Sequence, residues 1–312
     1  MVRLLAERRY LFSLAAIALL LPFFLPPYYK YPATELIIWG LLAISLDLLI
    51  GYTGLPSFGH AVFFGVPAYV FGIVAVRSDS FSLAVLSAIA GIGVVSAVVG
   101  YFATRTGGVG YIIVTLLCSF AVFILTFVWT PVTGGENGLY VPEKFSMAAW
   151  SPDVRYALVA AIGVGVWGLA AKLVGSGYGP VLRGIKANEQ RMQAMGYNVQ
   201  RAKFQITVVS GAIAGLAGFL YAVVIRTLSA DLVGPELSTE IVIWVLLGGA
   251  QTLLGPVFGA ALFISLKQLL NTVTAYPMLL GLLFIAVVVW APTGLINLRR
   301  GRKPLAPARA QN

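Results

Sequence analysis

Long apolar stretches separated by short polar segments run along almost the entire chain. A membrane-spanning helix needs about 20 predominantly apolar residues. The pattern therefore predicts an all-α polytopic membrane protein with about 8–10 transmembrane helices, several of them short or interrupted by Gly or Pro. The candidate spans are Tyr10–Pro26, Glu35–Ile50, Phe58–Val76, Phe81–Ala103, Gly110–Thr130, Tyr156–Val174, Phe204–Ile225, Ile241–Leu254, Gly255–Leu270 and Tyr276–Pro292.

Two of the apolar stretches contain a break. Residues 48–74 and residues 241–264 each read as an apolar run, a glycine-containing turn, a proline and a second apolar run. Interrupted helices in corresponding halves of a chain are typical of internal repeats whose breaks border a solute pathway near the middle of the membrane. The predicted breaks are Gly51–Gly59 and Gly248–Gly255. The alternative is that both breaks only bend helices for packing.

Five residues at these breaks are candidates for the translocation path. Ionisable groups inside membrane spans are usually functional, which draws attention to Asp47 and His60. For Asp47 the alternative is solvation at the cytoplasmic end of its span. For His60 the alternative is a hydrogen-bonded packing role at the start of a helix. The candidate path residues are Asp47, Ser57, Gly59, His60 and Gln251.

One long polar segment, Gly175–Lys203, lies between two predicted spans. Pro180 suits the first turn of a helix, and Gly196 stands where a helix would end. The segment predicts a short amphipathic helix that docks a soluble partner, and a helix lying passively at the membrane surface is the alternative. Apolar positions at roughly helical spacing are Leu182, Ile185, Met192 and Met195, with Arg183, Lys186, Glu189 and Arg191 between them.

Two neighbouring features complete the pattern. The stretch SGAIAGLAGFLYA, residues 210–222, carries small residues that allow helices to pack closely. The polar loop Pro131–Arg155 mixes Gly, Pro, aromatic residues and both signs of charge. It is expected either to be a solvated connector or to present a surface to an extracytoplasmic partner.

The composition supports the membrane assignment. Of the 312 residues 59% are hydrophobic and only 10% are charged, whereas a soluble domain carries about 25% charged residues. The apolar runs are continuous and do not alternate as the strands of a membrane β-barrel do. The single cysteine, Cys118, excludes an internal disulfide and is expected to be a small buried hydrophobic residue.

The distribution of positive charge predicts the orientation. With the amino terminus in the cytoplasm, 15 of the 21 Lys and Arg residues fall in cytoplasmic segments. Both termini are therefore expected in the cytoplasm, and the net charge of +10 is explained without nucleic acid. The six basic residues on the other side are Lys30, Arg77, Lys144, Arg155, Arg226 and Lys267.

The first apolar run follows Arg3, Arg8 and Arg9 and in this respect is similar to a signal peptide. A small-residue cleavage site does not follow it; the sequence PFFLPPYYKYP does. We expect a retained first helix.

Several kinds of chemistry find no support in the sequence. The chain lacks a G-x-x-x-x-G-K-[ST] motif, so it is not expected to bind ATP by a P-loop. One His and one Cys support neither a structural metal site nor a conventional catalytic constellation, so an enzyme is not expected. A transporter without an ion relay points to an energy source on another chain. A stand-alone secondary transporter or channel, and a membrane scaffold or enzyme subunit, remain as alternatives.

Five segments of the chain, in their order along the sequence, resemble segments of a known family. The chain is similar to the M-type permease subunits of the high-affinity leucine/isoleucine/valine ABC transporters. Pro67 stands where that family more often has a small residue, and Phe58 replaces a usual Leu. The segments that carry the resemblance are GYTGLPSFGHAVFFGVPAYV, TGGENGLYVP, LRGIKANEQRMQAMGYNVQRAKFQITVVSGAIAGLAGFLYA, LLGGAQTLLGPVFGAAL and LLFIAVVVWAPTGLINL.

The resemblance implies a set of partners and a mechanism. A second permease subunit would share the path for a small-molecule substrate. Two P-loop ATPase subunits would bind the ATP, so that this chain needs no cofactor of its own. An extracytoplasmic solute-binding protein would dock on the other face. The residues expected to couple the chain to the ATPases are Arg183, Gly184, Lys186, Glu189, Arg191, Ala194, Met195 and Gly196.

These expectations define the organisation of the chain. A transmembrane permease domain is expected over residues 1–298, with the coupling loop at 175–203. Residues 299–312 are expected to form a disordered basic cytoplasmic tail. The expected location is the bacterial inner membrane. The cargo is left open between a branched-chain amino acid, another amino acid, urea and an amide, and the permease pair between a homodimer and a heterodimer.

Overall fold

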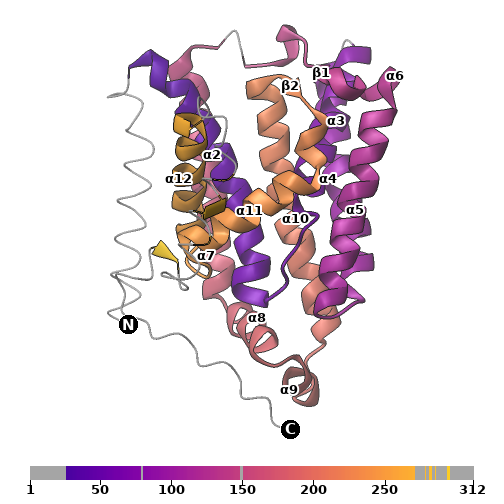
Figure 1. The fold of residues 1–312 in the computed structure, drawn as a ribbon, viewed down its shortest axis with the longest axis vertical. Coiled ribbons are helices and arrows are strands. Elements are labelled where there is room, and N and C mark those ends of the chain that lie inside the picture. The colour runs from indigo at the N-terminus through magenta and orange to yellow at the C-terminus, as the bar shows by residue number, and fades with distance from the viewer. Residues whose placement is uncertain are drawn as a thin grey trace.

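The computed structural model describes residues 26–78, 80–147 and 150–270, together with positions 278, 281, 282, 285, 294 and 295. The predicted spans Tyr10–Pro26 and Tyr276–Pro292 and the predicted tail 299–312 lie almost entirely outside these residues. The described chain is an elongated bundle of helices with very short strands at one end (Figure 1). The predicted all-α fold class is confirmed.

Within the described residues, 6 helical segments are long and apolar enough to cross a membrane. Each overlaps one of the predicted spans. The spanning segments are α2 (Pro27–Asp47) with its continuation as the π-helix η1 (Leu48–Thr53), α3 (His60–Arg77), α4 (Phe81–Thr104), α5 (Val109–Val128), α7 (Pro152–Gly175) and α10 (Val199–Ile225). The helices α2, α7 and α10 begin earlier than predicted because polar residues continue the helix past the apolar band, whereas α3 begins at His60 instead of Phe58 and α5 ends at Val128 instead of Thr130.

The predicted boundaries of the span Ile241–Leu254 are wrong. The helix there, α11 (Pro235–Gly248), begins earlier, with Pro235 at its first position, and α12 (Gly255–Leu270) follows after a loop. In the loop 249–254 the backbone is left-handed at Gln251 (φ 67°) and Leu253 (φ 57°), which no helix can continue. The predicted break Gly248–Gly255 is therefore confirmed as an interruption between two short helices.

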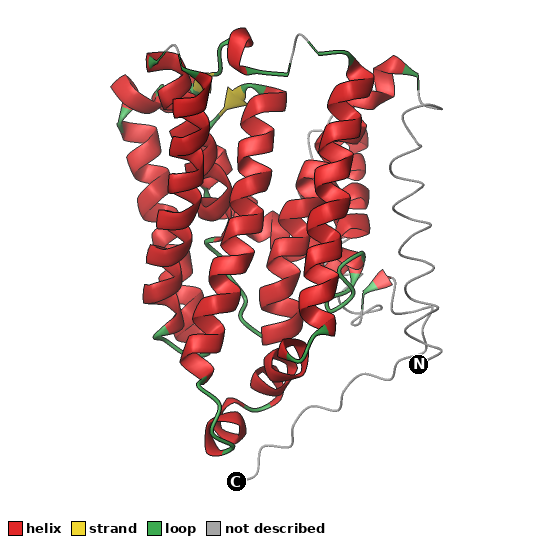
Figure 2. Cartoon of the chain, turned by 180° about the vertical axis from the view of Figure 1, so that it is seen from behind, coloured by secondary structure: helices red, strands yellow, loops and turns green. Residues whose placement is uncertain are grey.

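The first predicted break is also confirmed. The π-helix η1 ends at Gly54, whose φ of 75° is left-handed, and an irregular segment leads to α3. Figures 1 and 2 show this segment climbing from the lower end of α2 to a start of α3 partway up the bundle. His60 is the first residue of α3. Its predicted place at a helix start is thereby confirmed.

Helices α3 and α10 pack closely together. A Cβ added to Gly218 would lie 1.8 Å from the carbonyl oxygen of Phe64 on α3. Only glycine allows this approach of two helix backbones, so the predicted packing role of the 210–222 stretch is confirmed. Beside it, the rings of Trp39, Phe64 and Tyr221 lie 5.2–5.5 Å apart between centroids, and they join α2 to the same core.

Short elements cover the upper end of the bundle. Strands β1 (Leu139–Tyr140) and β2 (Thr227–Leu228) pair antiparallel, so the loop after α5 is attached to the chain that follows α10. Arg226 strengthens this attachment: its Nε donates to the carbonyl of Val141 at 3.2 Å. The other elements in these loops are α6 (Thr130–Thr133), η2 (Gly135–Asn137), η3 (Glu143–Phe145) and η4 (Ala230–Val233).

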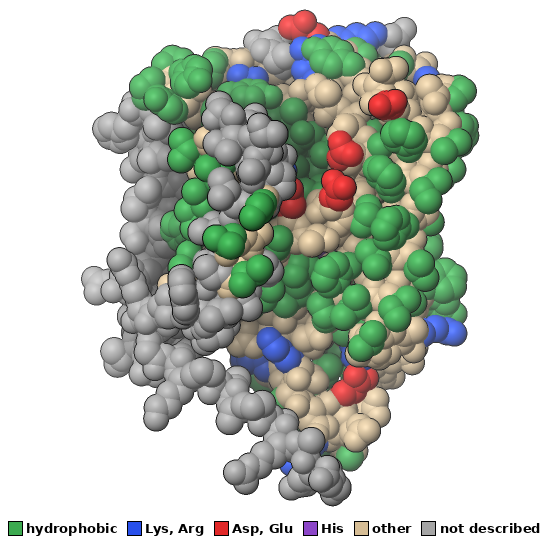
Figure 3. Space-filling model, in the orientation of Figure 1, with side chains coloured by type: hydrophobic (Ala, Val, Ile, Leu, Met, Phe, Trp, Pro, Cys, Tyr) green, Lys and Arg blue, Asp and Glu red, His purple; other side chains and the backbone are tan. Residues whose placement is uncertain are grey.

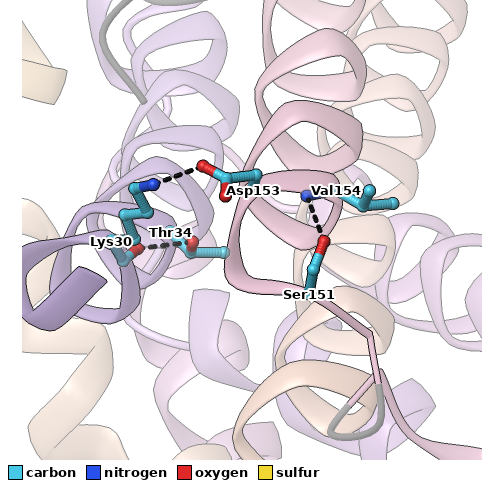
Figure 4. A network of polar contacts seen from close by, with 5 residues as sticks. All are labelled: Lys30, Thr34, Ser151, Asp153 and Val154. Carbon is cyan, nitrogen blue, oxygen red and sulfur yellow. Dashed lines mark hydrogen bonds and ion pairs between the residues drawn. The ribbon is translucent and has the colours of Figure 1, made fainter. Parts of the chain in front are cut away.

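A polar contact fixes the beginnings of α2 and α7 to each other. The buried Lys30 ammonium of α2 reaches the carboxylate of Asp153 in the first turn of α7 (Figure 4). Ser151 caps α7 by accepting the N–H of Val154 at 3.4 Å. The two helices are thus aligned at the same end of the bundle as the strands.

The lower end of the bundle carries two short helices, α8 (Tyr178–Ala187) and α9 (Glu189–Ala194) (Figures 1 and 2). On the face in Figure 3, hydrophobic side chains are spread over the middle together with several Asp and Glu side chains in its upper half, and Lys and Arg side chains lie near the upper and lower ends.

Candidate functional site

The predicted amphipathic helix of the long polar loop is two helices. Asn188 separates them because its backbone is extended (φ −164°), and its side chain caps α9 by accepting the N–H of Arg191 at 2.8 Å. Gly184 allows α8 and α9 to fold together, since a Cβ there would lie 2.6 Å from the sulfur of Met192. Gly196, with φ 87°, ends the helical region as predicted.

Some apolar residues of this loop pack against the bundle, and one is exposed to solvent. Leu182, Ile185 and Met192 are buried, the last two against Val199 at the start of α10. Met195, in contrast, is 61% exposed. The loop is therefore attached to the bundle along one side and offers its other side to solvent.

The residues expected to couple the chain to ATPases divide in the same way. The exposed ones are Arg183, Lys186, Arg191, Ala194, Met195 and Gly196. Gly184 lies between the two helices. The charged groups of Lys186 and Glu189 nevertheless bond within their own chain, which the sequence pattern did not reveal.

Glu189 forms an ion pair with Lys203 on the first turns of α10. The distance between Glu189 Oε2 and Lys203 Nζ is 2.5 Å, and the Lys203 side chain is only 3% exposed. The sequence placed Glu189 on a solvated helix face, free for a partner. The structure shows that this carboxylate already neutralises a buried ammonium.

Lys186 reaches the end of the first helix interruption. Its Nζ donates to the carbonyl oxygens of Gly51 at 2.7 Å and Ile50 at 3.2 Å. Burial lowers the pKa of the Lys186 ammonium, and the opposite charge of Asp47 acts to raise it. The contact joins the polar loop to η1, which precedes Lys186 by about 135 residues.

Asp47 connects the two interruptions. Its side chain is fully buried, so the solvated alternative is wrong. One carboxylate oxygen accepts the N–H of Gln251 at 2.8 Å, and the other accepts the N–H of Leu253 at 3.0 Å. Tyr52 adds a hydrogen bond from its hydroxyl to the carbonyl of Gln251 at 3.0 Å. The carboxylate thereby holds the left-handed loop 249–254 against η1.

Gly51 lies where these segments come closest. A Cβ at this position would lie 2.1 Å from Asp47 Oδ1 and 2.7 Å from the backbone nitrogen of Gln251. We call the group Asp47, Gly51, Lys186, Gln251 and Leu253 the junction. It unites the loop between α7 and α10, the end of η1 and the loop between α11 and α12.

The other path candidates lie around the start of α3. Ser57 and His60 are fully buried, and His60 Nε2 lies 2.7 Å from the hydroxyl of Ser45. Gly59 is held close to α5, because a Cβ there would lie 2.2 Å from the carbonyl oxygen of Thr115. Through Ser45 and Asp47, the end of α2 bonds to both interruptions.

Some polar atoms in this region have no hydrogen-bond partner among the described residues. They are His60 Nδ1 and Ser96 Oγ. Buried polar groups in folded proteins are normally paired with protein or water, so this part of the bundle has unused capacity for polar partners. Within the same described part of the chain, no group of three His, Cys, Asp or Glu side chains could hold a metal ion.

Sequence reasoning missed the partners of the candidate residues. Ser45 and Lys203 carry no signal of their own, because a serine in an apolar run and a lysine at the start of a span are common. Only their long-range contacts, to His60 and to Glu189, mark them as part of the site.

Comparison with known proteins gives a consistent result. Residues 29–291 match the family model described as the permease component of branched-chain amino acid transport systems. The chain is 25% identical to the high-affinity branched-chain amino acid transport system permease protein LivM of Salmonella typhimurium, over 98% of this chain and 78% of that protein. It is also 25% identical to LivM of Escherichia coli, over 94% of this chain and 76% of the relative.

An archaeal relative is similar as well. The probable branched-chain amino acid transport permease protein LivM of Methanocaldococcus jannaschii is 22% identical, over 83% of this chain and 90% of its own length. No solved structure matches the chain.

Proposed function

Because the chain belongs to the family of branched-chain amino acid transport permease components, we propose that it is the membrane-spanning permease subunit of an ABC importer. In this role it forms, with a second permease, the path for a branched-chain amino acid or a related small polar solute. Two cytoplasmic P-loop ATPase subunits dock below the bundle, and an extracytoplasmic binding protein delivers the solute from above.

One observation carries the proposal beyond the family. The loop of α8 and α9 projects from one end of the bundle, and its exposed side holds Arg183, Arg191 and Met195. Its other side contacts η1 through Lys186, and Asp47 in turn connects η1 to the second interruption. A loop that is exposed on one side and connected to interrupted helices on the other is suited to transmitting the conformational change of a soluble ATPase to the membrane-spanning helices.

Reconstitution tests this function. The chain should co-purify with a P-loop ATPase, and the assembled complex in liposomes should take up leucine, isoleucine or valine only with ATP and the binding protein. Uptake by the chain alone, driven by a solute or ion gradient, would instead support the alternative of a stand-alone secondary transporter or channel. Binding measurements on the purified binding protein, with urea and amides included, would identify the cargo.

We predict that both ends of the chain are cytoplasmic in the bacterial inner membrane. In a Cys118→Ser background, single cysteines at Ser146 and Ser176 report on the two ends of the bundle. A membrane-impermeant thiol reagent should label Cys at position 146 in intact cells, and at position 176 only after the cells are permeabilised. The reverse pattern would invert the topology and place α8 and α9 outside.

We also predict that the helix interruptions border the translocation path. Single cysteines at Ser57 and His60 should be unreactive in the resting state, because both positions are fully buried. They should become reactive toward small polar thiol reagents when ATP binding is trapped or substrate is added. A cysteine at Gln251, which is partly exposed, should react in the resting state. If positions 57 and 60 stay unreactive in every state while His60→Ala transports normally, the interruptions only serve packing.

A further inference from the structure

The contact of Lys186 with η1 is built as a specific attachment. The carbonyls of Ile50 and Gly51 belong to the end of a helix, where carbonyl groups lack helical partners and the dipole favours a cation. Gly54 makes room for the Lys186 stem, because a Cβ there would lie 2.9 Å from Lys186 Cγ. The ammonium is thus positioned on η1 by charge and by shape.

The attachment continues beyond η1. Asp47, one turn before Gly51, holds the backbone N–H groups of Gln251 and Leu253. Lys186 and Asp47 also attract each other electrostatically. A displacement of α8 would therefore pull on η1 directly and on the loop 249–254 through Asp47.

We propose that Lys186 is a positioning residue that fastens α8 to η1, so that both helix interruptions follow the loop of α8 and α9 as one body. This inference rests on the proposed function, since it concerns how ATPase movement reaches the path. It reassigns Lys186 from a contact with the ATPase to an internal link. Lys186 is itself an exposed residue, but its ammonium is bonded to η1. Arg183, three residues earlier and also exposed, is left as the cation available to a partner.

The first test removes the link from the assembled importer. Lys186→Met should lower ATP-driven uptake by at least about tenfold, which corresponds to the loss of one hydrogen bond to a charged group. ATP hydrolysis and assembly with the ATPase should persist, because the ammonium is bonded to η1 of its own chain. Lys186→Arg keeps a cation and should restore part of the uptake. Lys172→Met, at an exposed position of α7, is the matched control and should transport as the wild type does.

The second test replaces the link with a covalent bond. An added Cβ at Gly54 would lie 3.4 Å from Lys186 Cβ, close to the separation in a disulfide. In a Cys118→Ser background, the Gly54→Cys/Lys186→Cys double variant should transport when oxidised and lose transport when reduced. A purely structural role of Lys186 would not make uptake follow the redox state of this bond.

The outcomes separate the two proposals. Wild-type coupling in Lys186→Met, or loss of ATPase binding in that variant, would overturn the internal link. Blocked uptake by the oxidised double variant would show that α8 moves relative to η1, which also contradicts it. The Lys186→Met and Lys186→Arg results decide the matter if the left-handed Gly54 does not accept a cysteine. An absence of ATP-dependent uptake in the wild-type complex would instead refute the proposed function.

Discussion

Replacing Asp47 with alanine is expected to abolish transport and to lower the free energy of unfolding by about 2–4 kcal/mol. The substitution leaves the backbone N–H groups of Gln251 and Leu253 without their acceptors in a fully buried site. Each buried, unpaired donor costs about 1–3 kcal/mol, and the removal of a carboxylate that had to be desolvated offsets part of the sum. The loop 249–254 would lose its attachment to η1.

Thermal unfolding of the purified protein in detergent, together with uptake by the reconstituted complex, measures both effects. Asp47→Asn keeps one acceptor and a similar shape, so it should lose about half as much stability, since one of the two N–H groups stays paired. Asp231→Ala is the matched control at an exposed aspartate and should unfold as the wild type does. If Asp47→Ala unfolds and transports like the wild type, Asp47 does not hold the two interruptions together.

Replacing Glu189 with lysine is the second change with a large expected effect. It would place two ammonium groups together at a site where Lys203 is only 3% exposed. Breaking a buried ion pair costs about 3–5 kcal/mol, and the partial exposure of Glu189 places the expected loss near the lower end, at about 3 kcal/mol. The attachment of α9 to α10 should weaken, and ATP hydrolysis should no longer drive uptake.

The charge-swapped variant Glu189→Lys/Lys203→Glu separates two roles of this carboxylate. If Glu189 acts through Lys203, the double variant should recover thermal stability and coupled uptake. A variant that recovers stability but stays uncoupled would instead support a direct contact between Glu189 and the ATPase. Arg191→Glu, a charge reversal at an exposed position of the same helix, should leave the unfolding temperature unchanged and serves as the stability control.

The two substitutions differ in what they reveal about the site. The Asp47 substitutions test whether the two interruptions are held together inside the bundle. The Glu189 substitutions test whether the loop of α8 and α9 is held to the bundle. Together with the link through Lys186, these contacts would form a continuous mechanical connection from the ATPase side to the interrupted helices.

Much of the fold could be predicted from the sequence because its signals are local. Apolar runs long enough to span a bilayer located α2 to α5, α7 and α10. Glycine and proline predicted the interruptions near Gly51 and Gly248, because these residues favour backbone that a continuous helix excludes. The order of several such segments was sufficient to identify the family.

The boundaries of α11 show where local signals end. Leu253 and Leu254 look like the continuation of an apolar span, yet they belong to the loop 249–254. The backbone of this loop follows the hydrogen bonds that the N–H groups of Gln251 and Leu253 donate to Asp47, and Leu253 is buried by tertiary packing. A long-range acceptor thus outweighs the helix propensity of a leucine pair.

By itself, therefore, the sequence determined the all-helical membrane class, most of the spans, the two interruptions and the amphipathic character of the long loop. Only the tertiary structure decided that Lys186 and Glu189 bond to groups of their own chain and that Asp47 meets Gln251, 204 residues away along the chain. The physical reason is that hydrophobicity and backbone preference are properties of neighbouring residues. The partner of a buried charge depends on which distant segment the packing brings to it, and that partner decides whether the charge is internal or free for another protein.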